Sequence, residues 1–63
     1  MEAREIRAMA TEEIQLKLEE AREELFNLRF QWSTRQLKDT NRLTQVRRDI
    51  ARLKTILREM ELA

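Results

Sequence analysis

The chain has 63 residues, of which 13 are basic and 12 are acidic, and it contains no cysteine or histidine. A chain of this length forms at most one small domain, whose own core is marginal and which commonly depends on a partner for stability. The missing cysteines and histidines exclude disulfides, thiolate metal sites and the commonest general base. Glycine and proline are also absent and 40% of the residues are charged, which favours long helices over sheets.

The first residues predict a short leading helix over residues 2–9. Its apolar residues, Ile6 and Met9, are expected to pack against the open end of a helical hairpin. This segment lacks the apolar core of a signal peptide. No apolar run elsewhere approaches the roughly 18 residues that span a bilayer. We therefore expect a cytoplasmic protein without a membrane partner.

A long helix is predicted over residues 11–36. Thr11 is the expected N-cap, and Glu12 and Glu13 follow it, where the positive end of the helix favours acidic side chains. Apolar residues recur at alternating steps of four and three, which is the seam of a coiled coil. The seam residues of this helix are Ile14, Leu18, Ala21, Leu25, Leu28 and Trp32.

A turn is predicted at about residues 37–39 and a second long helix over residues 40–61. Asp39, Thr40 or Asn41 can cap this helix. The same alternating steps define its seam, which consists of Leu43, Val46, Ile50, Leu53, Leu57 and Met60.

The two seams predict an antiparallel pairing within one chain. Residues that face each other in a hairpin have position numbers with a constant sum. Trp32 with Leu43 and Leu18 with Leu57 both sum to 75, and the remaining pairs sum to 74 or 75. The prediction is therefore a single all-α domain over residues 1–63, an antiparallel two-helix hairpin with a short N-terminal helix.

The seams do not include every apolar residue, and those off them include Phe26, Phe30, Leu37 and Ile56. They fit either a widened core or a surface patch that packs against a neighbouring molecule. A two-helix layer has little chain with which to cover two phenylalanines. We therefore treat Phe26 and Phe30 as candidates for a protein contact.

The charges are distributed unevenly. Residues 1–28 have a balance of −4, whereas residues 29–58 contain nine basic and two acidic side chains. On the second helix Arg47, Lys54 and Arg58 lie within about 40° of one another. Such a concentration favours a polyanion partner, and a hairpin without an aromatic platform suits docking onto folded RNA by shape.

The sequence offers little to an enzyme. Neighbouring glutamates such as Glu19 and Glu20 diverge by about 100° on a helix, so they do not converge on one substrate atom. Ser33 and Thr34 have no histidine as a base, and no glycine-rich phosphate loop exists. We expect no catalysis, no cofactor, no metal and no small-molecule substrate.

Five stretches have the residue order of a known family: Glu5–Arg7, Thr11–Ile14, Glu24–Gln31, Gln36–Leu37 and Val46–Leu57. In this order the chain resembles the bacterial large-subunit ribosomal proteins numbered twenty-nine, over almost its whole length. The last stretch is the most specific, because it combines the seam, the small residue Ala51 and the basic side chains.

The resemblance implies a structural protein of the large ribosomal subunit, bound to its ribosomal RNA near the exit of the peptide tunnel. It also implies an adjacent ribosomal protein and nearby nascent-chain factors as partners. The basic positions that match the family, and to which it implies RNA binding, are Arg29, Arg47, Arg48, Arg52 and Lys54. Many members have a glycine in the turn where this chain has Arg35, so we expect the first helix to continue to about residue 36.

Three other functions remain to be weighed. A free coiled-coil module that binds protein and no nucleic acid fits the seams, but it leaves the basic second half unexplained. In a zipper protein that binds DNA the basic stretch precedes the seam, whereas residues 47–58 interleave the two. A membrane-surface helix needs a free apolar stripe, which here faces the partner helix.

Overall fold

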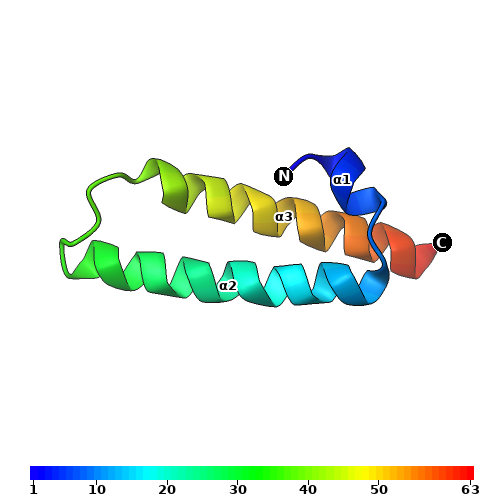
Figure 1. Ribbon diagram of the computed structural model, residues 1–63, viewed down its shortest axis with the longest axis horizontal. Helices are drawn as coiled ribbons and strands as arrows, with labels where there is room; N and C mark the ends of the chain where they lie inside the picture. Colours follow the sequence, from blue (N-terminus) through cyan, green and yellow to red (C-terminus); the bar gives the residue numbers. More distant parts are fainter.

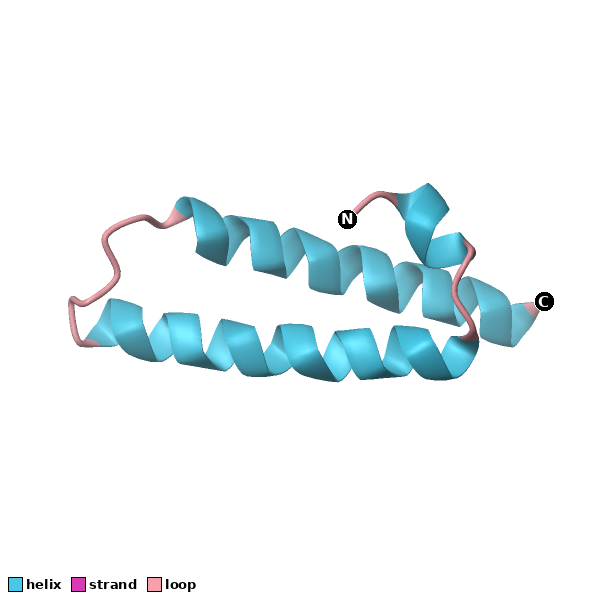
Figure 2. Cartoon of the chain, in the orientation of Figure 1, coloured by secondary structure: helices cyan, strands magenta, loops and turns pink.

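The computed structural model describes residues 1–63 and contains three helices and no strand (Figures 1 and 2). Their bounds are Ala3–Arg7 for α1, Thr11–Ser33 for α2 and Asn41–Leu62 for α3. The two long helices run antiparallel and pack against each other, and α1 packs against α3. The molecule measures 43 × 17 × 15 Å. The predicted all-α hairpin with a short N-terminal helix is confirmed.

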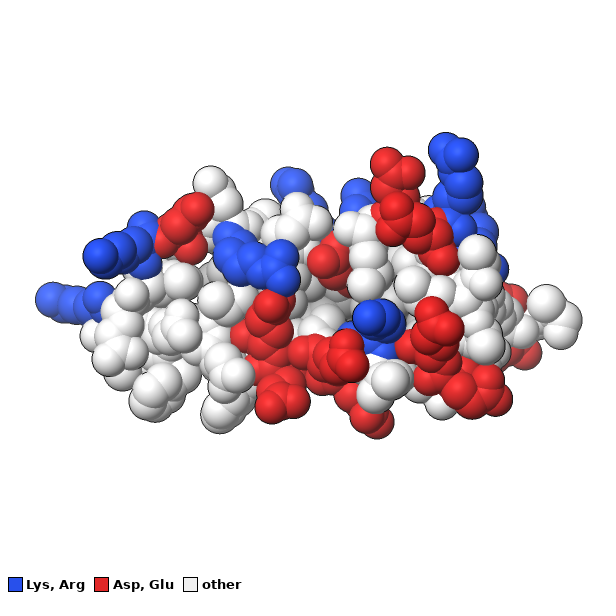
Figure 3. Space-filling view, viewed as in Figure 1, with Lys and Arg blue, Asp and Glu red and all other residues white.

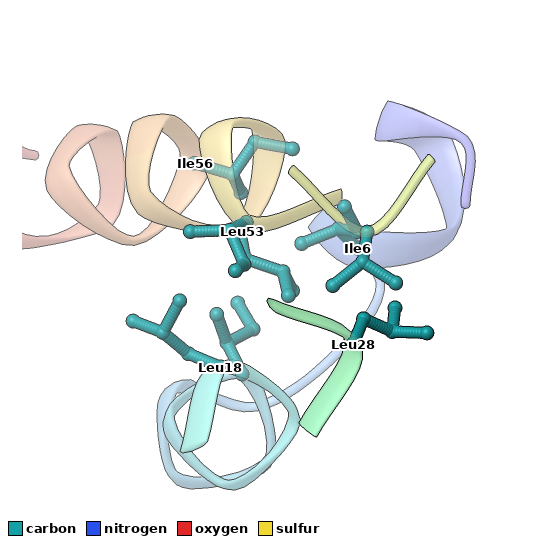
Figure 4. Close-up of a cluster of buried hydrophobic side chains, with 8 residues drawn as sticks. Ile6, Leu18, Leu28, Leu53 and Ile56 are labelled. Atoms are coloured by element: carbon teal, nitrogen blue, oxygen red, sulfur yellow. The ribbon is translucent and has the colours of Figure 1, made fainter. Parts of the chain in front are cut away.

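The core consists only of aliphatic side chains. Figure 4 shows Ile6 of α1, Leu18 of α2, and Leu53 and Ile56 of α3 converging between the helices. The eight buried residues are Ile6, Ile14, Leu18, Leu28, Val46, Ile50, Leu53 and Ile56. All are seam positions of the predicted hairpin except Ile6 and Ile56, which join the core because α1 covers this side of α3.

Helix α1 is shorter than the predicted segment 2–9. It ends at Arg7 because the next two backbone N–H groups bond to carbonyls only three residues earlier, in a tight turn. The helix lies on the C-terminal half of α3 (Figure 1). Its Ile6 is fully buried, and Met9 packs against the core as a half-buried residue.

Helix α2 begins at Thr11, the first residue of the predicted range, but Thr11 is not its N-cap. Ala10, with an extended backbone, occupies the N-cap position without a capping side chain. The N-cap of α3, Thr40, also makes no side-chain cap bond. The carboxylate of Asp39, the residue before it, accepts a hydrogen bond from the backbone N–H of Asn41 at 2.9 Å in the turn that leads into the helix.

Helix α2 ends at Ser33, three residues before the predicted end. The hydroxyl groups of Ser33 and Thr34 donate to the carbonyl of Phe30 at 2.8 and 3.2 Å. They add to the backbone N–H of Thr34, which donates to the same carbonyl at 3.1 Å, and together these bonds hold the last turn of the helix. The loop therefore spans residues 34–40 instead of 37–39.

The helix end is a left-handed cap centred on Arg35, whose φ of 61° is the one positive value in the chain. The N–H of Arg35 donates to the carbonyl of Trp32 at 3.0 Å, and that of Gln36 donates to the carbonyl of Gln31 at 2.8 Å. This pair of bonds defines the Schellman motif. Arg35 thus occupies a position that glycine usually fills, and the helix stops without glycine.

The two long helices are offset at the loop end. The loop end of α2 extends beyond the start of α3 (Figure 1). Across the helices Arg42 Nη2 donates to both carboxylate oxygens of Glu24 at 2.7 Å. Further from the loop Leu18 and Leu57, a predicted seam pair, line one groove.

Trp32 lies in the last turn of α2, at this offset end. Its side chain is 56% exposed and is not part of the core. Leu37, which was expected on the flank, is half-buried and packs against the core from the loop. The loop end of the hairpin is thus closed by an aliphatic side chain from the loop, while the indole remains outside.

Candidate nucleic-acid interface

One flank of the hairpin carries a groove with basic side chains from both long helices. Lys54 and Arg58 of α3 and Arg22 of α2 line it, above an apolar floor that includes Leu18 and Leu57. Glu61, near the end of α3, is its one acidic side chain. The antiparallel packing therefore combines cations that are more than thirty residues apart in the sequence.

The opposite flank has a different character. There the groove between the helices is lined by Lys17, Glu20, Glu24, Arg42 and Asp49. Figure 3 shows most of the acidic side chains gathered over α2 on the visible face. Basic side chains project from the upper edge and from the loop end.

The cations of this second flank are paired within the chain. Lys17 lies 3.9 Å from the Glu20 carboxylate, and Arg42 has its two bonds to Glu24. The hydrogen bond to Glu24, and then the charge of the same carboxylate, raise the pKa of Arg42. The guanidinium therefore remains charged and bound within the molecule.

Arg47 and Arg48 flank a shallow hollow on the outer surface of α3. Thr44 and Ala51 complete its lining, and the small side chain of Ala51 keeps it open. Arg47 lies seven residues before Lys54, so both project from nearly the same side of the helix. The hollow and the basic groove are therefore adjacent parts of one surface.

Two of the expected RNA-binding residues, Arg52 and Arg29, line neither the groove nor the hollow. Arg52 points towards the N-terminal segment, where its Nη1 donates to the carbonyl of Met1 at 2.7 Å. The Met1 amine in turn lies 3.2 Å from Asp49. Arg29 is exposed on α2, seven residues after Arg22 and thus on the same flank.

The basic side chains of this surface have no acidic partner in the protein. The four ion pairs within 4 Å involve Met1 with Asp49, Arg7 with Glu59, Lys17 with Glu20 and Arg42 with Glu24. We define the basic surface as the exposed and unpaired cations Arg22, Arg29, Arg47, Arg48, Lys54 and Arg58. Such free guanidinium groups suit oxygen anions arranged in a series, since each presents a planar fork of donors.

Arg22 is not among the RNA-binding residues predicted from the sequence. It lies in the half of the chain with a negative balance, so the count of charges assigned it to the acidic helix. The signal that identifies it is its spacing of seven residues from Arg29, which places both on one face. The sequence places Arg58 on the flank of the second helix. Because Arg58 also lines the groove, it belongs to the basic surface.

The two candidate protein-contact residues are exposed. Phe26 is 70% and Phe30 is 60% exposed, and they lie one turn apart on α2. None of the three helices combines the length and the apolar character needed to cross a bilayer.

Comparisons with known proteins identify the family of this chain. The sequence pattern of the family described as "Ribosomal L29 protein" matches residues 4–59. "Large ribosomal subunit protein uL29" of Geobacillus stearothermophilus is 60% identical over 63 residues, which cover 100% of this chain and 96% of the relative. The protein of the same name from Natranaerobius thermophilus is 61% identical over 62 residues, covering 98% of this chain and 95% of the relative. The chain therefore belongs to the ribosomal L29 protein family.

Proposed function

We propose that this protein is a structural constituent of the large ribosomal subunit in the cytoplasm, with no catalytic role. The observation that supports the proposal is the basic surface, whose cations have no acidic partner within the chain. Its relatives are named as proteins of the large subunit. The ligand that fits a row of free cations on a rigid hairpin is ribosomal RNA, bound through its phosphates.

In this proposal the residues of the basic surface bind phosphates at different places along the hairpin. Lys54, with Arg22 and Arg58 beside it, binds phosphates along the groove, and Arg47 and Arg48 bind them around the hollow. Arg29 extends the same flank towards the loop. Arg52 contacts RNA and also holds the N-terminal segment before α1, where its guanidinium donates to the Met1 carbonyl. Contacts of this kind bring affinity and orientation with little reading of base sequence.

From the family resemblance we infer that the protein lies near the exit of the peptide tunnel, beside another ribosomal protein. Phe26 and Phe30 are the residues proposed for that protein contact. Each exposes more than half of its side chain on one face of α2, and exposed apolar patches commonly mark contacts between proteins. Nascent-chain factors would then dock nearby.

The experiment is mass spectrometry of ribosomal subunits from the source cell, purified through a high-salt wash. We expect one copy of the chain per large subunit. Its absence from both subunits would contradict the proposal and favour a free coiled-coil module that binds protein alone.

A variant with Arg47→Glu and Arg48→Glu tests the basic surface in the same assay. We expect normal helicity and at least a tenfold loss of incorporation. The control variant, Arg4→Glu with Lys17→Glu, changes the net charge by the same amount away from this surface. Arg52 is left intact because its reversal would also disturb α1. Equal incorporation of both variants would contradict the assignment.

A further inference from the structure

The loop end of the hairpin contains a hollow that is separate from the basic groove. It is lined by Trp32, Ser33, Arg35 and Leu37, and has a volume of about 440 Å³. The Schellman motif fixes the backbone of this segment, since the N–H groups of Arg35 and Gln36 both bond into the end of α2. The hollow is thus part of the ordered cap of the helix.

Trp32 supplies this hollow with an aromatic face. It is the one tryptophan of the chain, and it is 56% exposed and lies outside the aliphatic core. It lies in the last turn of α2 (Thr11–Ser33), the end that extends beyond the start of α3 (Figure 1). An indole in this position offers a broad π surface to a planar ligand.

Arg35 supplies the same hollow with a free cation. No carboxylate lies within 4 Å of it, in contrast to Arg42 a few residues further on. Its φ of 61° lies in the left-handed region, where any residue with a Cβ is strained and glycine is relaxed. The chain therefore keeps a strained, charged residue at a position where a smaller, uncharged one would fit better.

We propose that Trp32 and Arg35 form a site for one unpaired RNA nucleotide, with the base stacked on the indole and the phosphate bound by the guanidinium. The inference rests on the proposed function and deepens it by naming a second class of RNA contact. The basic surface fits the phosphates of paired, folded RNA, whereas this hollow fits a nucleotide that has left its helix.

The charge of the loop favours RNA over a protein ligand. Residues 34–40 contain Arg35 and Lys38 against one acid, Asp39, whose carboxylate already accepts a bond from Asn41. An acidic peptide would use the cations but leave the indole uncovered. A nucleotide uses both, because it joins an anionic phosphate to a planar base.

The hollow provides few groups that could read the edge of a base. The hydroxyl groups of Ser33 and Thr34 both donate to the Phe30 carbonyl, and Leu37 contributes only carbon atoms. Stacking without hydrogen bonds to base edges tolerates any base. We therefore expect the site to distinguish single strands from duplexes rather than one base from another.

The test is a fluorescence titration of the full chain, with Trp32 as its own reporter. The probes are a single-stranded RNA hexamer, a blunt duplex of the same sequence and hexaglutamate. We expect saturable quenching by the single strand and at most slight quenching by the duplex or the peptide. Equal quenching by the duplex, or quenching by the peptide alone, would overturn the proposal.

Three variants identify the contributions, with a labelled hexamer followed by anisotropy. Trp32→Ala is expected to lower the affinity by about 5- to 100-fold. Arg35→Gly is expected to lower it roughly 10-fold while relaxing the backbone, and Arg35→Lys to lower it less. Circular dichroism verifies that each variant retains its helices. Unchanged affinity of Trp32→Ala in a folded chain would overturn the proposal.

A second measurement uses the assembled large subunit and separates this proposal from the previous one. In subunits that contain Trp32→Ala, chemical probing is expected to show one unpaired nucleotide that is more reactive than in the parent subunit. Normal incorporation with an unchanged probing pattern would overturn the nucleotide site alone. Failure of the parent chain to appear in the subunit would instead overturn the proposed function.

Discussion

The two ends of the hairpin are built differently, although both come from the same seam of apolar residues. At the end that holds α1, three helices enclose Ile6, Ile14 and Leu53, and all three side chains are fully buried. At the loop end only two helices meet, and Phe30 and Trp32 are more than half exposed. The five residues of α1 account for this difference, because they add a third layer at one end only.

The difference between the two ends explains why two apolar residues beside the seam have opposite environments, one buried and one exposed. Ile56 and Phe26 both lie beside the predicted seam, and neither faces the partner helix directly. Ile56 is buried because α1 reaches it, whereas nothing in the chain reaches Phe26. In so small a protein the distinction between core and contact surface depends on where one short segment packs.

The largest effect should come from breaking the α1 end with Leu53→Ala. Removal of a fully buried leucine costs about 2–5 kcal/mol, which is comparable to the whole stability of roughly 3–5 kcal/mol that a domain of this size has. We expect the variant to be largely unfolded at 25 °C, as measured by circular dichroism in a urea titration.

The matched control for Leu53→Ala is Phe26→Ala at the other end. It removes a larger side chain, but one that is 70% exposed, so a change within about 0.5 kcal/mol is expected. Similar urea midpoints for the two variants would show that the ends do not differ in packing.

A smaller effect is expected from Ile6→Ala, which should release α1 without unfolding the hairpin. Truncation of a buried isoleucine lowers the free energy of unfolding by about 2–4 kcal/mol. The loss here is no larger than the free energy with which α1 docks onto the hairpin. Amide hydrogen exchange should show lost protection in α1 and near Ile56, and unchanged protection around Leu28. Glu5→Ala, on an exposed position of the same helix, is the control. A uniform loss of amide protection over all three helices would mean that α1 and the hairpin fold as one unit.

The smallest effect, and one of opposite sign, is expected from Arg35→Gly. Relief of the left-handed backbone should raise the free energy of unfolding by about 0.5–1 kcal/mol, after the larger entropy of glycine in the unfolded chain is subtracted. A thermal melt measures this as a rise of a few degrees. Gln36→Gly, at a position without positive φ, should instead lower the melting temperature. A gain from both substitutions would show that the strain at Arg35 is not the cause.

The hairpin itself could be predicted because its signal is repeated many times. Ile14, Leu18, Ile50 and Leu53 all belong to the predicted seams and are all buried. The end of α2 and the offset of the two helices at the loop could not be predicted in the same way, because the apolar spacing carries no signal for them.

The offset depends on where α2 stops. That stop depends on hydrogen bonds of Ser33 and Thr34 and on the left-handed backbone of Arg35, none of which has an apolar period. The resemblance to a family with glycine at this position led to a helix that was too long. Non-glycine residues adopt the left-handed conformation rarely enough that the sequence did not indicate it.

The candidate site could be predicted as a set of residues but not as a surface. Charge distribution and family resemblance identified Arg47, Arg48 and Lys54, and all three are exposed without acidic partners. The separate position of Arg52, bonded to the N-terminal segment, depends on the docking of α1. A contact between residues 51 positions apart has no local signature in the sequence.

The position of α1 also has a consequence for the order of folding. Its contacts are with α3, and the hydrogen bond from Arg52 to Met1 joins nearly opposite parts of the chain. During synthesis α1 is made first, but its docking site is completed only when the last third of the protein has been made. The entropic cost of closing so long a loop also delays this contact during refolding. Helix α1, which is translated before α2 and α3, should thus be the last of the three to reach its native place.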